Sequence, residues 1–492
     1  MWVEALLLVL LFLLLKKVLR KPDGLPPGRW GLPLVGYIPL LDKRTMLEQL
    51  QDLRKQYGDV YTWRVGTQLM IFIHDYKLIK EAYSKSEVTE RPKWWFYNVG
   101  QNPGLGISGS NGERWHNNRR FTLRQLRDLG MGKSRLVEAV HRQASMLVEE
   151  LKKQSGQPAP IPHALNVAII NVIWQMVAGI QFEVDDPEMK KFQRMMLDFF
   201  VVTDRLIIPD LMPWLLQIMP KTLADRIFKM DHAMEMIDKF FNYFKAVMDE
   251  HRATLDRDNP RDLIDSYLMD MDDNQDDPES MLHEKDLSFI IFDLFFAGSQ
   301  TTADTLKFTF YYLANNPRVQ SKLQAELDET LGGALATLED RSRLPYTEAV
   351  IQEAMRMSTL TPIGLHHIAT KDLQLGGYHV PKGTVFNTMA ISVHYDPNIW
   401  EDPHQFLPER WMDDKGHFAF KREGFMAFSI GKRQCVGEAL ARMELLIVLA
   451  AVMANFTITP PPGKIIDCSP DPASELFHVS RPQDIVFTHR KQ

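Results

Sequence analysis

One of the two cysteines of the chain, Cys435, lies in a segment whose residue types suit metal binding. The segment, FSIGKRQCVG at 428–437, is followed at once by EALARMELLIVLAAVMA, a run typical of a buried helix. Free backbone N–H groups and the dipole at a helix N-terminus favour a negatively charged sulfur, and thiolate is the form of cysteine that binds metals. Gly431 permits a tight turn, Gly437 lets the backbone approach a flat group, and Arg433 lies near enough to pair with an anion. We therefore predict a thiolate ligand at Cys435.

The neighbourhood of this cysteine is unlike a zinc site. Zinc needs four ligands, and no second cysteine or histidine stands nearby in the sequence. A lone soft sulfur donor suits an iron ion whose other ligands come from a macrocycle. The segment also matches the spacing Phe-x-x-Gly-x-Arg-x-Cys-x-Gly at every fixed position. Four further strings accompany it: WHNNR at 115–119, AGSQTT at 297–302, EAMR at 353–356 and FLPERW at 406–411.

On these strings the chain resembles the animal microsomal members of the cytochrome P450 family over its whole length. The stretch RWHNNRRFTLRQLRDLG at 114–130 is most similar to arthropod members. The resemblance implies a cytochrome P450 fold, an NADPH-dependent monooxygenase and a bound haem b (iron protoporphyrin IX), with Cys435 as the metal ligand. Thiolate ligation in this class favours O–O cleavage. The residues that the resemblance places at the haem are Trp115, Arg119, Ala297, Gly298, His367, Arg433, Cys435 and Gly437.

Four of these residues are expected to contact the haem propionates: Trp115, Arg119, His367 and Arg433. An arginine or a protonated histidine makes a charge-assisted hydrogen bond to a carboxylate. Trp115 and Arg119 are four residues apart and share a helix face, although a core tryptophan beside a surface arginine would give the same spacing. The family usually has proline before the histidine, and this chain has His366.

Thr301 and Gln300 are the expected catalytic residues. Glycine inside a buried helix is unfavourable unless the space is needed, and by resemblance Ala297 and Gly298 form the oxygen groove over the iron. Thr301 then supports proton delivery to bound dioxygen, although a helical threonine often bonds only to its own backbone. The family usually has an acid where this chain has Gln300, and an amide cannot pass a proton as a carboxylate does. We expect oxygenation to survive, by another proton route, with slower turnover, or with chemistry that depends less on this relay.

Glu353, Arg356 and Arg410 are expected to have a structural role. A pair three residues apart on a helix is common and stabilises by only about 0.2–0.5 kcal/mol. By resemblance, however, the three side chains form a buried network that supports the cysteine loop. Buried charges are costly unless they are fully paired, so the loss of one should prevent haem incorporation.

The N-terminal residues predict a membrane anchor. Residues 5–15, ALLLVLLFLLL, carry no polar side chain, and basic residues follow at 16–21. A cleaved signal would have its positive charge before the apolar run, and the positive-inside rule keeps the basic residues and the protein body in the cytosol. We therefore expect an anchor over 1–21 in the endoplasmic reticulum membrane, a stiff Pro/Gly hinge over 22–36 and a haem-thiolate catalytic domain over 37–492. The run is shorter than the roughly 20 residues that span a bilayer, so a helix lying in the interface is the alternative.

Hydrophobic periodicity predicts a mainly α fold with a minor β region. Apolar residues recur at helical spacing in five segments: 134–153, 160–182, 186–205, 221–256 and 305–333. Residues 287–298 are apolar on nearly every side, as in a helix that crosses the middle of a large protein, and a last helix is expected near 437–454. Strands are expected at 60–65 and 69–74, with strand fragments after 360. The acidic segment 255–286 is expected to be a solvated connection.

Composition limits the partners. The net charge of −6 disfavours nucleic acid, and two cysteines fit a reducing compartment without disulfides. No flavin or Rossmann motif supplies electrons, so NADPH–cytochrome P450 reductase, with cytochrome b5 as a further candidate, is the expected partner. Seven basic residues and one acid in 114–135 would attract an acidic reductase.

The expected substrate is a lipophilic small molecule. Segments that line the pocket in similar enzymes are apolar and aromatic here: 94–98, 198–202, 295–297, 362–365 and 475–477. Terpenoid hormones, steroids and foreign compounds are candidates, among them an isoprenoid ester similar to juvenile-hormone precursors. Two alternatives remain: a haem-thiolate isomerase or dehydratase that needs no NADPH, and a haem-binding carrier or sensor.

Overall fold

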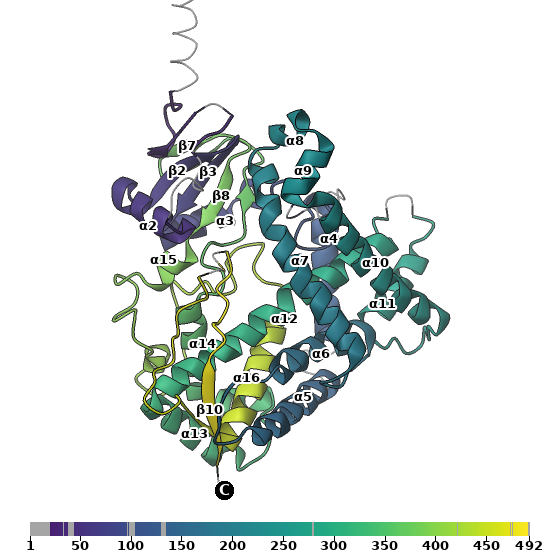
Figure 1. Ribbon diagram of the computed structural model, residues 1–492, viewed down its shortest axis with the longest axis vertical. Helices are drawn as coiled ribbons and strands as arrows, with labels where there is room; N and C mark the ends of the chain where they lie inside the picture. The colour runs from purple at the N-terminus through teal and green to yellow at the C-terminus, as the bar shows by residue number, and fades with distance from the viewer. Residues whose placement is uncertain are drawn as a thin grey trace, which may run out of the picture.

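The computed structural model describes residues 20–32, 34–37, 44–95, 97, 104–128, 134–277, 280–420, 422–472, 474 and 476–490, except for the side chains of 134–135 and 200–205. These residues form a large helical body and a smaller part that contains a five-stranded sheet, at the upper end of the view in Figure 1. The prediction of a mainly α fold with a minor β region is confirmed.

The helices have the following bounds. They are α2 (Met46–Tyr57), α3 (Tyr76–Ser84), α4 (Gly112–Asp128), α5 (Ser134–Lys153), α6 (Ala164–Ala178), α7 (Pro187–Leu211), α8 (Trp214–Ile218), α9 (Lys221–Phe228), α10 (Met230–Ala253), α11 (Leu263–Asp273), α12 (Glu284–Asn315), α13 (Pro317–Leu331), α14 (Pro345–Ser358), α15 (Ala390–His394) and α16 (Glu438–Asn455), with short 3-10 helices at Ser86–Val88, Glu339–Arg343 and Pro408–Trp411.

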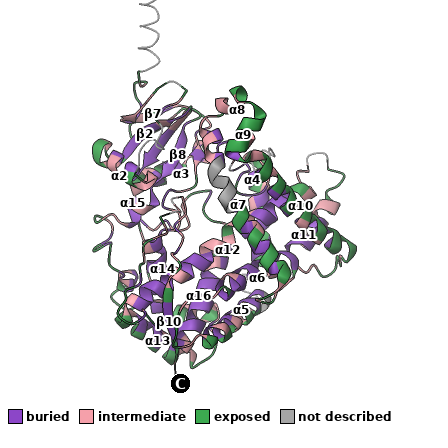
Figure 2. Ribbon diagram, in the orientation of Figure 1, coloured by how far each residue is buried: buried purple, intermediate pink, exposed green. Residues whose placement is uncertain are grey.

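Helix α12 crosses the helical body. It packs against α6, α10, α14 and α16, and most of its residues are buried (Figure 2). The apolar run at 287–298 therefore forms the central helix that its composition predicts, and α16 begins one residue after the predicted start at 437. These two helices carry or adjoin the residues expected to do chemistry.

The largest sheet has the order β1-β2-β3-β8-β5. Strands β2 (Val60–Val65) and β3 (Gln68–Ile73) pair antiparallel, with Trp63 opposite Met70, and they confirm the two predicted strands. Strand β3 pairs parallel with β8 (Val385–Thr388), which in turn pairs with β5 (His367–Ile368). Strand β1 (Gly28–Arg29) comes from the Pro/Gly segment and joins β2. The other strands are β4 (Pro158–Pro160), β9 (Phe456–Thr459) and β10 (Asp484–His489) in one sheet, and β6 (Leu373–Leu375) and β7 (Tyr378–Val380) in another.

The prediction of a solvated connection over 255–286 is wrong for its middle part. Helix α11 lies there, with Leu263, Tyr267 and Leu268 buried against the core. These apolar residues follow helical spacing, but the many acids around them outweighed that signal. Two predicted helices are also divided: 221–256 breaks at Lys229, whose φ is 58°, and 305–333 breaks before Pro317 because proline cannot continue a helix.

Within the described residues, no helix is both long enough and apolar enough to cross a membrane. The expected anchor over 1–21 falls almost wholly on residues 1–19, which lie outside the described part of the chain.

Candidate active site

The loop that carries Cys435 is shaped by two glycines. The backbone N–H of Cys435 donates to the carbonyl of Phe428 at 3.0 Å, which closes the loop before α16. Gly431 has φ 82°, and a Cβ there would lie 2.6 Å from the carbonyl oxygen of Tyr83, so only glycine fits the turn. A Cβ at Gly437 would meet only the Cys435 sulfur, at 3.9 Å. Glycine at 437 therefore leaves space beside the sulfur.

The sulfur of Cys435 faces a hollow inside the protein. The cysteine has accessible surface, yet burial is the main cause that raises the pKa of its thiol. Both hold only if the accessible surface lies within the molecule. The backbone N–H groups of Gly437 and Glu438 lower the pKa, as predicted for a helix N-terminus, but burial outweighs them. The helix N-terminus thus favours thiolate as predicted, but less strongly than burial opposes it, and a bound metal cation would stabilise the anion.

Helix α12 has one accessible stripe on its otherwise buried surface. Ala297 is exposed, and Gly298 and Thr301 are half-buried. Ala297 and Thr301 are four residues apart and so share a helix face. Because α12 packs against α16, which Cys435 precedes, we assign both accessible surfaces to one space. We call this space, bordered by Cys435, Ala297 and Thr301, the central hollow.

A cluster of arginines lies on the cysteine side of this space. Burial, and then the charges of Arg91 and Arg119, lower the pKa of Arg433 to about 8, and Arg119 also interacts electrostatically with Cys435. Among the described residues, none of the three arginines has an ion pair. Glu90 acts on Arg433 electrostatically but forms no ion pair with it among the described residues. Buried positive charge without a counter-ion is unfavourable, so a bound anion would stabilise the cluster.

Arg433 is anchored by the protein. Its guanidinium donates to the carbonyls of Thr89 at 2.9 Å, Ile107 at 3.1 Å and Ser110 at 2.6 Å, and it lies 4.1 Å from the centre of the Trp115 ring. Its expected contact with a propionate is therefore electrostatic rather than a free hydrogen-bond fork.

Trp115 supplies an unused donor. Its side chain is 3% exposed, and its buried Nε1–H has no hydrogen-bond partner. An unpaired buried donor is costly, and a carboxylate oxygen would satisfy it.

His367 is held as a neutral ring. Its Nδ1 lies 2.6 Å from the carbonyl of Val88, to which it donates, and the ring stacks on Tyr83 with centroids 4.1 Å apart. Burial and the charge of Arg91 hold its pKa well below the usual value. The histidine would donate from Nε2 only if a nearby carboxylate stabilised its protonated form.

Together these residues fit an anionic iron macrocycle. A sulfur donor on the wall of the hollow, three arginines without a counter-ion and an orphaned indole N–H are what haem b, with its iron and two carboxylates, would complete. Cys435 could hold the iron, and Trp115, Arg119 and Arg433 could hold the carboxylates.

The hydroxyl of Thr301 donates to the carbonyl of Ala297 at 2.7 Å, which is the backbone interaction named above as the alternative. Its lone pairs stay available on the half-buried side. Gln300 is turned toward Asp304 instead, and its Nε2 donates to the carboxylate at 2.6 Å. Asp304 is 1% exposed and also accepts from the hydroxyl of Ser480 at 2.8 Å. A buried carboxylate thus lies one helical turn from the position where the family usually has an acid.

Gly298 has a packing reason. A Cβ there would lie 3.0 Å from Cδ1 of Ile173 on α6. The glycine therefore permits α12 and α6 to approach closely, and the oxygen groove expected beside it stays a prediction.

The expected network of Glu353, Arg356 and Arg410 is present. Glu353 accepts from Arg356 Nη2 at 2.8 Å and from Arg410 Nε at 3.0 Å, and its carboxylate is fully buried. The indole N–H of Trp411 donates to it at 2.9 Å. Each buried charge thus has a partner of opposite sign, although the two arginines share one carboxylate.

His394, which the sequence did not single out, links this network to the cysteine loop. Arg356 donates to its carbonyl at 2.6 Å. Burial lowers the pKa of His394 to about 3, so its neutral Nε2 accepts the N–H of Met426 at 2.9 Å. The carbonyl of Met426 then accepts the N–H of Ser429 at 2.9 Å, inside the loop.

Three of the seven basic residues in the segment 114–135 form ion pairs. Arg124 bonds to Asp270, Arg127 to Asp128 and Arg114 to Asp286. Of its other basic residues, Arg119 belongs to the buried cluster, Arg120 is exposed, residue 133 lies outside the described residues, and the side chain of residue 135 is not described. The patch available to a reductase is therefore smaller than the sequence predicts.

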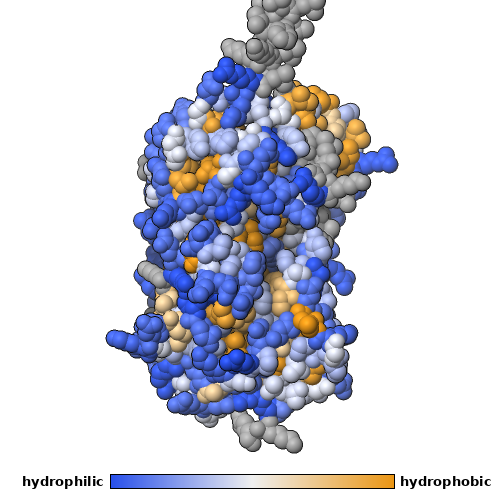
Figure 3. All heavy atoms as spheres, turned by 90° about the vertical axis from the view of Figure 1, so that its left-hand side faces the viewer, coloured by the Kyte–Doolittle hydropathy of each residue, from blue (hydrophilic) through white to orange (hydrophobic). Residues whose placement is uncertain are grey.

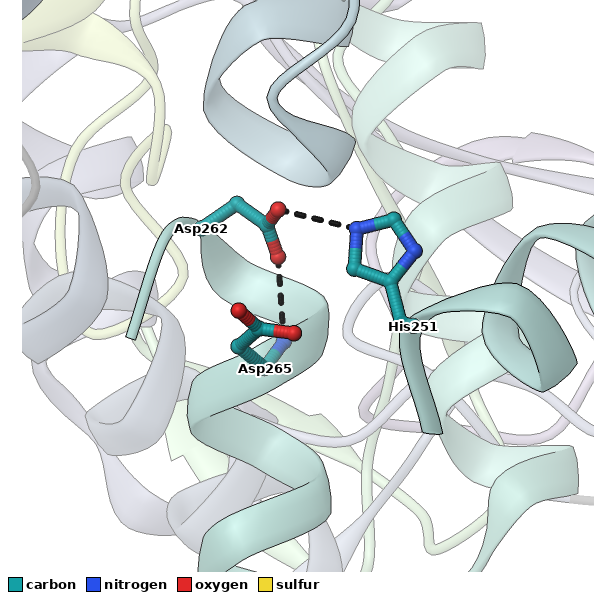
Figure 4. Close-up of side chains that lie close together, drawn as sticks. All are labelled: His251, Asp262 and Asp265. Atoms are coloured by element: carbon teal, nitrogen blue, oxygen red, sulfur yellow. Dashed lines mark hydrogen bonds and ion pairs between the residues drawn. The ribbon is translucent and has the colours of Figure 1, made fainter. Parts of the chain in front are cut away.

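Within the described ranges, His251, Asp262 and Asp265 have the spacing of metal ligands (Figure 4). Their polar atoms are already used: His251 Nε2 lies 2.9 Å from Asp262 Oδ2, and Arg261 bonds to Asp265. His251 Nδ1 also faces the carbonyl of Val247 at 2.8 Å, so both ring nitrogens donate. The group fastens α10 to α11.

The five expected pocket segments are described only in part. Positions 96, 98 and 475 lie outside the described residues, as do the side chains of 200–202.

Arg91 is the principal residue that sequence reasoning missed at the site, because a single arginine before a proline carries no spacing signal.

Comparisons with known proteins agree with this geometry. Residues 26–485 match the family described as Cytochrome P450. The chain is 41% identical to Cytochrome P450 2L1 of Panulirus argus over 483 residues, and this aligned region covers 96% of each chain. It is 34% identical to Cytochrome P450 18a1 of Drosophila melanogaster, over 93% of this chain and 86% of that one, and 36% identical to Cytochrome P450 2B4 of Oryctolagus cuniculus, over 95% and 94%. The expected likeness to arthropod members is confirmed. The chain belongs to the cytochrome P450 family, whose members bind haem b and act as haem-thiolate monooxygenases.

Proposed function

We propose that this enzyme takes electrons from NADPH through a separate reductase and inserts one oxygen atom into a lipophilic substrate, by hydroxylation or epoxidation. The observation that carries the proposal is the accessible surface of Cys435 inside the protein, beside three arginines that form no ion pair within the described residues. Haem bound there would supply the iron that activates dioxygen, with the thiolate favouring O–O cleavage.

The chain's own residues position the cofactor and control its surroundings. Cys435 is the metal ligand in this proposal, held in place by the hydrogen bond to Phe428 and by the network behind it. Trp115 and Arg119 would donate to the carboxylates, and the anchored Arg433 would add its charge. His367 would donate from Nε2 only in its protonated form, which an ionised carboxylate would stabilise.

Thr301 and Gln300 form the proton-handling part of the site in this proposal. The Thr301 oxygen accepts a hydrogen bond from water in the central hollow, since its own proton is given to Ala297. Gln300 cannot donate a proton to that water chain as an acid would. Asp304, bonded to Gln300, is the buried acid that remains one turn away.

The substrate is proposed to be a lipophilic small molecule. Phe199, Phe292 and Phe296 form an aromatic cluster beside the accessible stripe of α12, with centroids 5.1–5.8 Å apart, and Leu365 is 37% exposed. Apolar walls of this kind bind apolar ligands. Terpenoid hormones, steroids and foreign compounds all fit this class.

A membrane location is supported by an exposed apolar surface. Leu32, Leu34, Ile218, Leu223 and Ile227 are 44–71% exposed, and the indole of Trp214 donates to the Leu34 carbonyl at 3.0 Å, which joins the two segments. Figure 3 shows hydrophobic surface at the same end of the molecule that carries α8 and α9 in Figure 1. Such patches mark contact surfaces. We propose that this end rests on the endoplasmic reticulum membrane, with the anchor over 1–21 beside it and the body in the cytosol.

The proposed electron donor is NADPH–cytochrome P450 reductase, with cytochrome b5 as a second candidate. The exposed cations Arg120 and Lys432 lie in the segments that adjoin the cysteine side, and they would attract an acidic partner. High salt should then slow reductase-driven turnover and spare turnover driven by peroxide.

The test is reconstitution with haem, reductase and NADPH, with lipophilic compounds as substrates. We expect NADPH consumption and an oxygenated product that carries label from dioxygen. Turnover of a lipid peroxide without reductase or NADPH would instead identify an isomerase or dehydratase, and haem binding without any product would identify a carrier.

A further inference from the structure

His366 is the residue that departs from the family's usual proline, and the structure fixes its position from both backbone atoms. Its N–H donates to the hydroxyl of Tyr97 at 2.9 Å, and its carbonyl accepts from Arg91 Nη1 at 2.7 Å. The imidazole lies edge-on to the Trp94 ring, with centroids 4.7 Å apart. The ring is thus held in an aromatic environment directly after the exposed Leu365.

The hydrogen bonds assign the tautomer of this ring. The Tyr97 oxygen accepts the backbone N–H of His366, and we take its O–H as the donor to Nδ1, 3.0 Å away. Burial lowers the pKa of His366 to about 3, so the ring is neutral and carries one proton. With Nδ1 acting as an acceptor, that proton is on Nε2.

The Nε2–H group is a donor that makes no hydrogen bond within the described residues. His366 is half-buried, so part of the residue is accessible, although protein surrounds the ring closely enough to suppress its charge. As for Cys435, these two facts together place the accessible surface inside the molecule. Arg91, which bonds to the His366 carbonyl, also acts electrostatically on His367, as do Arg433 and His366. His366 therefore lies on the same side of the hollow as His367 and Arg433.

We propose that the Nε2–H of His366 donates a hydrogen bond to an oxygen acceptor of the substrate, a carbonyl of the ester or ketone type. This inference rests on the proposed function and narrows its substrate class. A neutral donor among aromatic rings is costly to leave unpaired once a ligand excludes water. A pocket with such a donor discriminates against analogues that lack the acceptor, which a purely apolar wall cannot do.

The experiment compares two ligands of equal length in the haem-loaded full-length protein. Methyl dodecanoate carries the carbonyl and tetradecane does not, and the binding of each is followed by the change in the haem absorption spectrum. We expect the wild-type protein to bind the ester roughly tenfold tighter than the alkane. Both affinities are first corrected for the different partition of the two ligands into detergent. His366→Phe, which keeps a flat ring and removes the donor, should abolish this preference. His366→Gln, which keeps an N–H near the Nε2 position, should retain part of it.

The outcomes separate this inference from the proposed function. Equal wild-type affinity for both ligands, or an unchanged preference in His366→Phe, would overturn the role of His366 while leaving the monooxygenase intact. A spectrum that responds to neither ligand would overturn the proposed function instead. A haem carboxylate is the other source of an acceptor oxygen. Faster loss of haem to apomyoglobin from His366→Phe, with the ester preference unchanged, would assign the donor to the haem and refute the proposal.

Discussion

Replacing Gln300 by glutamate would restore the acid that the family usually has, but the structure predicts that it destabilises this protein. The amide of Gln300 lies 2.6 Å from the buried carboxylate of Asp304. Two negative charges at that distance repel by about 6 kcal/mol at an effective dielectric constant of 20. Protonating the new carboxyl at pH 7, from an ordinary glutamate pKa, costs about 4 kcal/mol. Protonation is the cheaper response, so the loss of stability should be at most about 4 kcal/mol, reduced by Lys307, whose Nζ lies 3.5 Å from Asp304.

The assay is chemical denaturation of Gln300→Glu against the wild-type protein at several pH values. The deficit should shrink to about 1 kcal/mol near pH 5, because protonation is then nearly free, and the protonated acid donates to Asp304 as the amide did. Gln300→Glu/Asp304→Asn should recover most of the loss. Gln175→Glu, at a half-buried site on α6, is the matched control, because no carboxylate bonds to its side chain. A deficit that does not depend on pH, or that persists in the double variant, would refute the reasoning.

Three further predictions follow from other contacts. Glu353→Gln leaves two buried arginines without their charge partner and should cost about 3–5 kcal/mol, seen as a purified protein with little haem; full haem content would contradict the network's role. Trp115→Phe removes the orphaned N–H and should speed haem loss to apomyoglobin about tenfold, as expected for a lost hydrogen bond to a charged group, whereas an unchanged rate would exclude a carboxylate at the indole. For His251, burial is the largest single influence and opposes its charge, but Asp262, the Val247 carbonyl and Asp265 together raise its pKa above 6.5. The contribution of charged His251 to the free energy of unfolding is therefore fully present below pH 6.5 and is lost as the pH rises through the raised pKa. The difference in stability between wild type and His251→Asn should then close when denaturation is repeated at alkaline pH. A constant difference would mean that the imidazole is neutral.

Much of the site could be predicted because it is local in sequence. The turn at Gly431, the cysteine before α16 and the pair Glu353–Arg356 on α14 each lie within a few residues. Helix α5 was predicted with its observed bounds because its apolar stripe is regular. Patterns of this kind are set by backbone geometry and by helical periodicity.

The parts that the sequence did not predict depend on contacts between distant segments. The bond from His394 to the N–H of Met426 joins residues 32 apart in the chain, and Arg91 reaches the carbonyl of Leu365 across 274. No spacing rule anticipates such contacts. Asp304 was overlooked for another reason, because its importance depends on which way Gln300 points.

The roles of the glycines show the same limit. The sequence marks Gly298 as unusual inside a buried helix, but the close packing against Ile173 on α6 is visible only in the structure. A glycine signals that space is needed and does not say what fills it.

The ferrous–carbon monoxide absorption spectrum tests most directly whether the sulfur of Cys435 is the iron ligand. The wild-type protein is expected to show the strongly red-shifted band of thiolate-ligated haem, and Cys435→His to show the shorter-wavelength band of an imidazole-ligated haem, if it retains haem. The sulfur of the other cysteine, Cys468, accepts a hydrogen bond from the side-chain amide of Asn315 at 3.5 Å. Cys468→Ser should therefore leave the band unchanged. A red-shifted band that persists in Cys435→His, or that disappears in Cys468→Ser, would contradict the account.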